Sequence, residues 1–115
     1  MSLVERQPRD RIRDLNDAFR KSFDPTLGRI LLTSGVDSLP GDLKAMAIRK
    51  TATFDAFTPD NDSNGEHDFG NFELADRRFF WKIDYYDETM DGGAEDPADP
   101  SKTTRVLTLM LAEEY

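Results

Sequence analysis

The fold is decided by residues 69–86, which read FGNFELADRRFFWKIDYY. Aromatic and branched residues fill both halves, and Ala75-Asp76 lies near the turn, so we predict two antiparallel strands, Phe69–Leu74 and Arg77–Tyr86. Side chains along the second strand alternate between the two faces of a sheet. The face expected to join the core carries Phe79, Trp81, Ile83 and Tyr85. The other face carries Phe80, Lys82, Asp84 and Tyr86, which predicts partial cover or a binding groove.

Upstream of this pair, the sequence predicts two helices and two strands. Apolar residues recur at helical spacing over residues 8–23, which indicates an amphipathic helix. The apolar run 28–35 between two glycines predicts a buried strand. A second helix is expected to begin near Pro40, with Ser38 or Asp37 as its cap, and to end near Thr51. Residues 51–58 then predict a strand.

Downstream of the pair, residues 87–101 form a long loop and the chain is expected to close on a helix. Asp99 is its predicted cap and Pro100 its first residue, although Leu107, Leu109 and Leu111 also alternate as in a strand. The predicted order is α-β-α-β-β-β-α. It defines a single α+β domain over residues 1–115, with an antiparallel sheet of about four strands and three helices.

Composition excludes several classes of protein. The chain has 115 residues, with 8 Phe, 3 Tyr and 1 Trp, so wholesale disorder is not expected. The absence of cysteine excludes disulfides, thiolate zinc sites and iron–sulfur clusters. No apolar run is long enough to span a membrane. We therefore expect a cytoplasmic protein with no membrane attachment and no cofactor, except for the calcium alternative below.

The net charge of −8 is unevenly distributed. Residues 1–50 hold 7 acids and 10 bases, whereas residues 51–115 hold 16 acids and 5 bases. Such a balance argues against direct nucleic-acid binding and favours a basic protein partner. The predicted binding residues are the acids Asp84, Asp87, Glu88, Asp91, Glu95, Asp96 and Asp99. A solvated loop that only keeps the protein soluble is the alternative, and self-association between the basic first helix and the acidic half also stays open.

Residues 60–68 resemble the start of a calcium-binding loop. Oxygen-bearing side chains fall at alternating positions, followed by Gly65 where such loops turn sharply. Position 12 is Asn71 instead of a bidentate Glu, and the flanks are strand-like, so a structural turn built from Asx side chains is the competing interpretation. The candidate metal ligands are Asp60, Asp62, Asn64 and Asp68.

A small enzyme or ligand-binding site is the third hypothesis. His67 is the only histidine and could act as a general base, or it could simply fix its loop through a hydrogen bond. If the loop folds over the mixed sheet face, titratable groups would gather there. The candidate catalytic residues are Glu66, His67, Asp68, Lys82 and Asp84. No phosphate-binding loop, nucleophile elbow or metalloprotease motif is present, so we lean away from an enzyme.

Three motifs, GEHDFG (65–70), FFWKIDYYD (79–87) and TRVLTLMLAEEY (104–115), resemble a bacterial family of small proteins defined as a domain of unknown function. Members are proteobacterial and plasmid-borne. The resemblance implies a free-standing cytoplasmic protein, often near mobile DNA, and provides no activity or site residue. Together with the charge, it leads us to expect a non-catalytic acidic binding protein that acts through protein–protein contacts. Such a protein could be a phosphate-mimicking inhibitor or an accessory factor of a mobile element.

Overall fold

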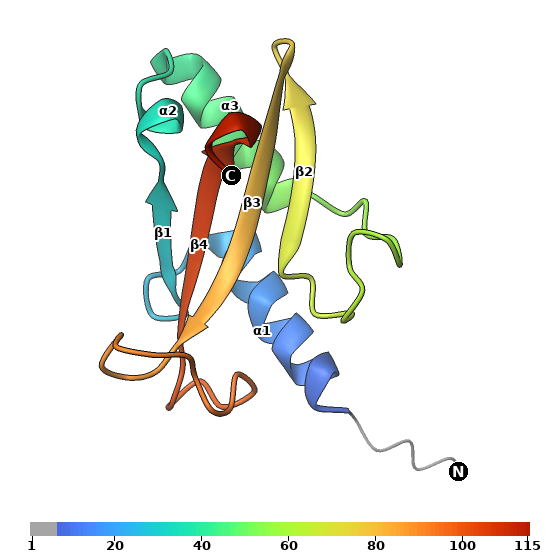
Figure 1. Ribbon diagram of the computed structural model, residues 1–115, viewed down its shortest axis with the longest axis vertical. Coiled ribbons are helices and arrows are strands. Elements are labelled where there is room, and N and C mark those ends of the chain that lie inside the picture. The colour runs from blue at the N-terminus through green and yellow to red at the C-terminus, as the bar shows by residue number, and fades with distance from the viewer. Residues whose placement is uncertain (1–6) are drawn as a thin grey trace.

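The computed structural model describes residues 7–115 and contains three α-helices and a four-stranded sheet (Figure 1). The strand order is β1-β4-β3-β2. The elements are α1 (Pro8–Ser22), β1 (Arg29–Leu32), α2 (Ser34–Asp37), α3 (Gly41–Thr53), β2 (Phe69–Leu74), β3 (Arg77–Tyr86), β4 (Thr104–Leu111) and the 3₁₀ helix η1 (Ala112–Glu114). The predicted α+β class, with its four strands and three helices, is confirmed. None of the helices in residues 7–115 is long and apolar enough to cross a membrane.

The β2–β3 hairpin is confirmed with the bounds predicted from the sequence. Ala75 and Asp76 form its turn, and both have positive φ angles, of 53° and 61°. Two consecutive residues in this conformation give the backbone twist that matches a hairpin. Asp tolerates the conformation better than most residues, which suits Asp76, whereas Ala75 adopts it without such a preference.

The predicted closing helix is wrong, because residues 104–111 form strand β4 at the centre of the sheet. Pairing with strands β1 and β3 decides this segment. Arg105, Leu107 and Leu109 point to the helix side of the sheet, and both faces of the strand are largely buried. Asp99 accepts hydrogen bonds from the amide and hydroxyl of Ser101, at 2.9 and 2.6 Å. It therefore closes an Asx turn and does not cap a helix.

The predicted strand over residues 51–58 is also wrong, because α3 continues to Thr53 and a loop follows. The hydroxyls of Thr51 and Thr53 donate to the carbonyls of Ala47 and Arg49, each at 2.9 Å. Both β-branched residues thus fit into the helix by bonding back onto it.

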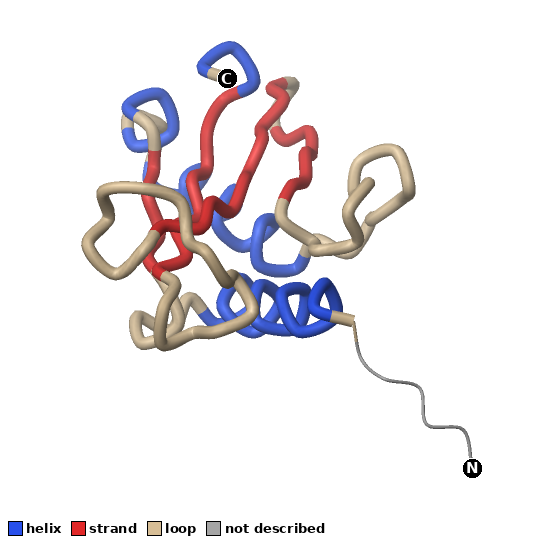
Figure 2. Tube along the Cα trace, turned by 60° about the horizontal axis from the view of Figure 1, so that its bottom comes forward, coloured by secondary structure: helices blue, strands red, loops and turns tan. Residues whose placement is uncertain are grey.

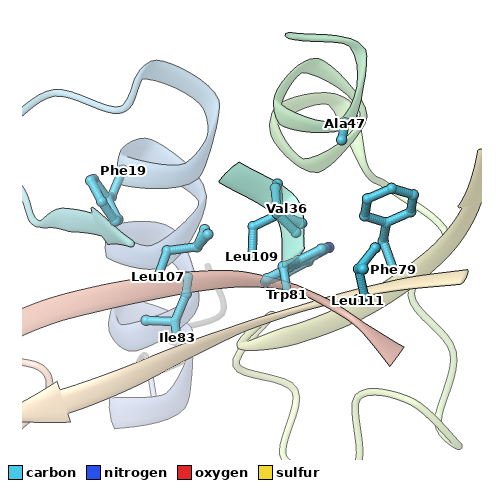
Figure 3. Packing of buried hydrophobic residues seen from close by; sticks show 9 residues of the cluster. All are labelled: Phe19, Val36, Ala47, Phe79, Trp81, Ile83, Leu107, Leu109 and Leu111. Carbon is cyan, nitrogen blue, oxygen red and sulfur yellow. The ribbon is translucent and has the colours of Figure 1, made fainter. Parts of the chain in front are cut away.

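The sheet is mixed, whereas we predicted an antiparallel one. β4 pairs antiparallel with β3 but parallel with β1. Helices α1 and α3 lie on the same face of this sheet (Figures 1 and 2), and the core fills the space between them and the strands (Figure 3). Its buried residues are Phe19, Val36, Ala47, Phe79, Trp81, Ile83, Leu107, Leu109 and Leu111. We call this the helix face of the sheet and the opposite side the open face.

Candidate functional site

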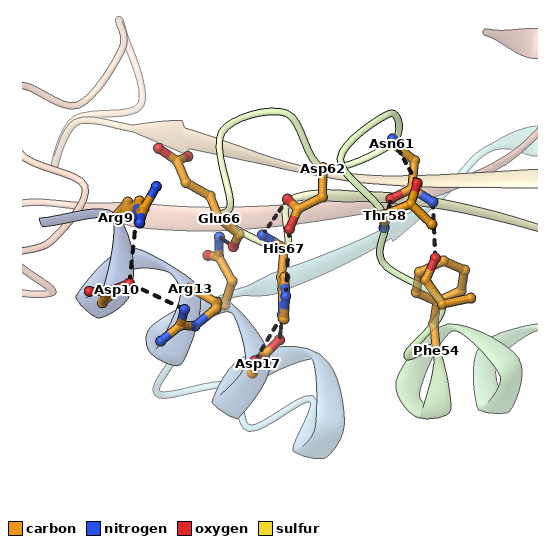
Figure 4. A network of polar contacts seen from close by, with 12 residues as sticks. Arg9, Asp10, Arg13, Asp17, Phe54, Thr58, Asn61, Asp62, Glu66 and His67 are labelled. Carbon is orange, nitrogen blue, oxygen red and sulfur yellow. Dashed lines mark hydrogen bonds and ion pairs between the residues drawn. The ribbon is translucent and has the colours of Figure 1, made fainter. Parts of the chain in front are cut away.

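His67 lies on the helix side of the molecule and joins the 54–68 loop to α1 (Figure 4). Its Nδ1 lies 2.9 Å from one carboxylate oxygen of Asp17, and its Nε2 lies 3.5 Å from a carboxylate oxygen of Asp62. The ring of Phe57 stacks on the imidazole at 3.7 Å between centroids. Both ring nitrogens and one ring face are therefore engaged, as in a residue that holds its loop in place.

Lys82 and Asp84 lie on the open face, where they form an ion pair of 2.9 Å. His67 instead stacks on Phe57, which also contacts Trp81 on the helix face. Since Lys82 follows Trp81 in the strand, its side chain points the opposite way. The structure therefore does not bring the five candidate catalytic residues into one pocket.

Glu66 belongs to a buried polar network that the sequence did not indicate as a site. Asn16 is fully buried and donates to the hydroxyl of Tyr85 at 2.7 Å, which in turn donates to Glu66 at 3.0 Å. Arg105, also buried, donates to the side-chain carbonyl of Asn16 at 2.7 Å and to the backbone carbonyl of Pro97. One feature of the sequence could have indicated this network: Asn16 and Arg105 are polar residues at core-facing positions in otherwise apolar patterns.

The pKa values of two groups in and beside this network, Tyr85 and Asp68, are raised. Burial raises the pKa of the Tyr85 hydroxyl, so that it stays protonated beyond the pH at which an exposed tyrosine ionises. Burial, and then the nearby charge of Glu66, raises the pKa of the Asp68 carboxyl. The surroundings of Asp68 thus disfavour the charged form of its carboxyl.

Replacing Asp68 by asparagine is expected to raise the free energy of unfolding at pH 7, by on the order of 0.5 kcal/mol. A raised folded-state pKa means that ionised Asp68 destabilises the fold above that pKa. The gain is therefore full above the folded-state pKa, shrinks as the pH falls through that pKa, and disappears only below the unfolded value of about 4. Urea unfolding of both proteins across this range checks it. Asp60→Asn, an exposed change in the same loop, is the control, and a gain independent of pH would contradict the explanation.

The predicted calcium ligands do not converge in the structure. Asp60 and Asn64 are exposed. The Asp62 carboxylate accepts the backbone amide of His67 at 2.9 Å and faces its ring. Within residues 7–115, no group of three or more acidic or histidine side chains is arranged to hold a metal ion. The contacts made by Asp62 are those of the structural turn that we named as the alternative.

The acidic loop that follows β3, residues 87–99, uses some of its carboxylates to fix its own backbone. Asp87 accepts from the amides of Thr89 and Asp91 and the hydroxyl of Thr89, and Asp96 accepts from the amide of Ala98. Such bonds lower the pKa of Asp87, and the bonds from Ser101 lower that of Asp99. The remaining acids are a different group: Glu88, Asp91 and Glu95 are exposed, and their side chains form no hydrogen bond or ion pair within residues 7–115. We call these three the free acids of the loop.

The open face of the sheet carries a groove of about 530 Å³, as the alternation in residues 79–86 predicted. Val106, Thr108 and Met110 of the central strand form its floor. Leu31 lines it from the edge strand β1, and Met90 lines it from the acidic loop. The other lining residues are Arg29, Thr33, Lys82, Asp84, Tyr86, Glu114 and Tyr115. The volume is in the range of pockets that bind small molecules or a few side chains of a partner.

Glu114 closes one end of this groove and ties η1 to the start of α2. Its carboxylate accepts from the Thr33 hydroxyl at 2.6 Å, from the Gly35 amide at 3.0 Å and from the Leu111 amide at 2.9 Å. These three bonds lower the pKa of Glu114. At the same end, the Phe80 ring contacts those of Phe69 and Tyr115, so an aromatic cluster borders the groove.

Comparison with known proteins identifies a family for most of the chain. Searches of curated proteins and of solved structures gave no match. A family model described as "Protein of unknown function (DUF3768)" matches residues 32–114, a range that includes α2, α3 and strands β2 to β4. Because this match spans more than half of the sequence, the chain belongs to that family.

Proposed function

We propose that this protein is a non-catalytic binding protein that holds a basic protein partner through the acidic loop. The observation that carries the proposal is that the acids of the loop form two groups, one that binds the backbone of the loop and one that does not. Asp87, Asp96 and Asp99 fix the backbone, while the free acids face solvent with no ion pair in the described part of the chain. A charged surface held in place before binding loses little freedom when a partner arrives.

The buried network supports this role, because it anchors the far end of the loop. Arg105 donates to the carbonyl of Pro97, inside the loop, and its guanidinium is itself held by Asn16. The whole protein carries a net charge of −8, which speeds association with a cationic surface. Carboxylates in such an array compete for sites that otherwise hold phosphates. We extend the proposal to an inhibitor or accessory factor of a nucleic-acid-handling protein in plasmid-bearing bacteria.

The test neutralises the free acids without disturbing the turns. We expect the triple variant Glu88→Gln, Asp91→Asn, Glu95→Gln to bind a short synthetic peptide of alternating lysine and serine about tenfold more weakly, since each exposed charge pair contributes up to about 1 kcal/mol. Fluorescence anisotropy at two ionic strengths provides the measurement. Higher salt should weaken binding to the unmodified protein more than to the variant.

A matched variant removes the same charge elsewhere on the surface. Asp42→Asn, Asp60→Asn, Asp76→Asn changes three exposed acids outside the loop. It is expected to retain most of the affinity. Equal losses in the two triple variants would show that net charge alone attracts the peptide, and the proposed binding surface would then be abandoned.

A further inference from the structure

We infer that the groove on the open face holds the apolar side chains of an amphipathic, basic segment of the partner. The inference rests on the proposed function and deepens it, because it specifies the chemistry of what the acidic loop recognises. The partner segment would place its apolar residues against Leu31, Met90 and Thr108 of the groove and its lysine or arginine residues beside the free acids.

The first observation is the unequal cover of the two faces of the sheet. Helices α1 and α3 pack on the helix face. On the open face, side chains bury Val106 and Met110 of the floor, but Leu31 remains 54% exposed and Met90 37% exposed. Apolar side chains that border a hollow and remain exposed are typical of a docking site.

The second observation is that one turn provides both the apolar wall and the acids. Met90 has a φ of 64°, and its amide donates to the carbonyl of Asp87 at 3.1 Å. The Asp87 carboxylate binds the amides on both sides of it, those of Thr89 and Asp91. The turn that directs Met90 into the groove therefore carries the free acid Asp91 as the next residue. A single segment of a partner can contact both.

The third observation is the distribution of charge within the groove. Lys82 and Asp84 neutralise each other across 2.9 Å, and Arg29 and Glu114 add one charge of each sign, so the side chains that line the groove attract neither sign strongly. The excess negative charge lies in the acidic loop at one end. Charge complementarity thus orients the partner, with its apolar face on Leu31 and Thr108 and its basic face toward the loop.

The experiment compares synthetic peptides by fluorescence anisotropy. An amphipathic leucine–lysine peptide is expected to bind about tenfold more tightly than the lysine–serine peptide of equal charge, the gain expected from burying one leucine-sized group. A leucine–glutamate peptide with the same apolar pattern should not bind. Equal affinity for the two basic peptides would overturn the groove inference and leave the proposed function standing. If neither basic peptide binds, the groove inference and the proposed function are both overturned. Tight binding of the acidic peptide would also overturn both, because charge would then not select the partner.

Variants locate the apolar contact. Leu31→Ser removes an apolar wall of the groove, and Thr108→Trp fills the groove with a large side chain. Each variant should bind the leucine–lysine peptide only as tightly as the lysine–serine peptide. Met46→Ser is the matched control, because Met46 is 50% exposed on α3, outside the groove. Equal effects of Leu31→Ser and Met46→Ser would overturn the inference. Sedimentation completes the test: a dimer that Leu31→Ser dissociates would identify a second copy of this chain as the occupant and also overturn it.

Discussion

Replacing Arg20 by alanine is expected to lower the free energy of unfolding by about 3–5 kcal/mol, a large part of the stability of a small domain. Arg20 is only 1% exposed. Its Nη1 donates to the carbonyls of Thr51, Ala52 and Phe54 at 2.9, 3.2 and 2.9 Å, where α3 ends. The guanidinium also lies 5.0 Å from the ring centre of Trp81. The variant loses these contacts together and leaves carbonyls without a partner.

Urea unfolding followed by tryptophan fluorescence measures this loss. Arg20→Lys keeps the charge but not the planar set of donors, and it should recover part of the stability. Arg11→Ala, on the exposed side of the same helix, should change the free energy of unfolding by less than about 0.5 kcal/mol. A loss below about 1 kcal/mol for Arg20→Ala would mean that Arg20 does not hold the end of α3.

The change Gly70→Ala is expected to cost about 3 kcal/mol through overpacking. A β-carbon at residue 70 would lie 2.4 Å from Nε1 and 2.6 Å from Cε2 of the Trp81 indole, well inside van der Waals contact. The indole is fully buried, and the Phe54 ring packs against it at 5.6 Å. It therefore has little room to move aside, and the strain passes into the β2–β3 pair.

A second substitution separates overpacking from a backbone effect. Trp81→Phe makes room next to residue 70, so the double variant should lose less than the sum of the two single variants. Gly41→Ala provides the control, because a β-carbon at residue 41, the first residue of α3, meets no atom within 4 Å. It should be neutral or slightly stabilising. Additive losses in the double variant would contradict the packing explanation.

Sequence patterns predicted the elements whose determinants are local. The β2–β3 hairpin has two alternating strands and a turn within 18 residues, and all of its signals lie there. Residues 104–111 fit helical and alternating patterns alike, and pairing with β1 and β3 decides between them. The end of α3 depends on Arg20, which is 31 positions away from Thr51 in the chain. Such long-range contacts leave no mark in a local window.

The same distinction applies to the candidate sites. The mixed face of β3 could be predicted because alternation is a local property, and the groove lies there. The position of His67 could not, since its partner Asp17 precedes it by 50 residues. The acidic loop was visible as a run of charge. Which of its acids would fold back on the backbone and which would remain free depended on turn geometry.

The central place of β4 has a consequence for the order in which this protein is made. Strand β4 lies between β1 and β3, yet it follows both of them along the chain. As the chain leaves the ribosome, β1 emerges before β4, its one strand partner within residues 7–115, has been synthesised, and the β2–β3 hairpin has no strand that joins it to β1. The sheet can close only after residues 104–111 have emerged. A nascent chain stalled before that point exposes the edges of β1 and β3 that β4 would cover, in addition to the outer edges of the sheet, and unpaired strand edges are a hazard that chaperones limit.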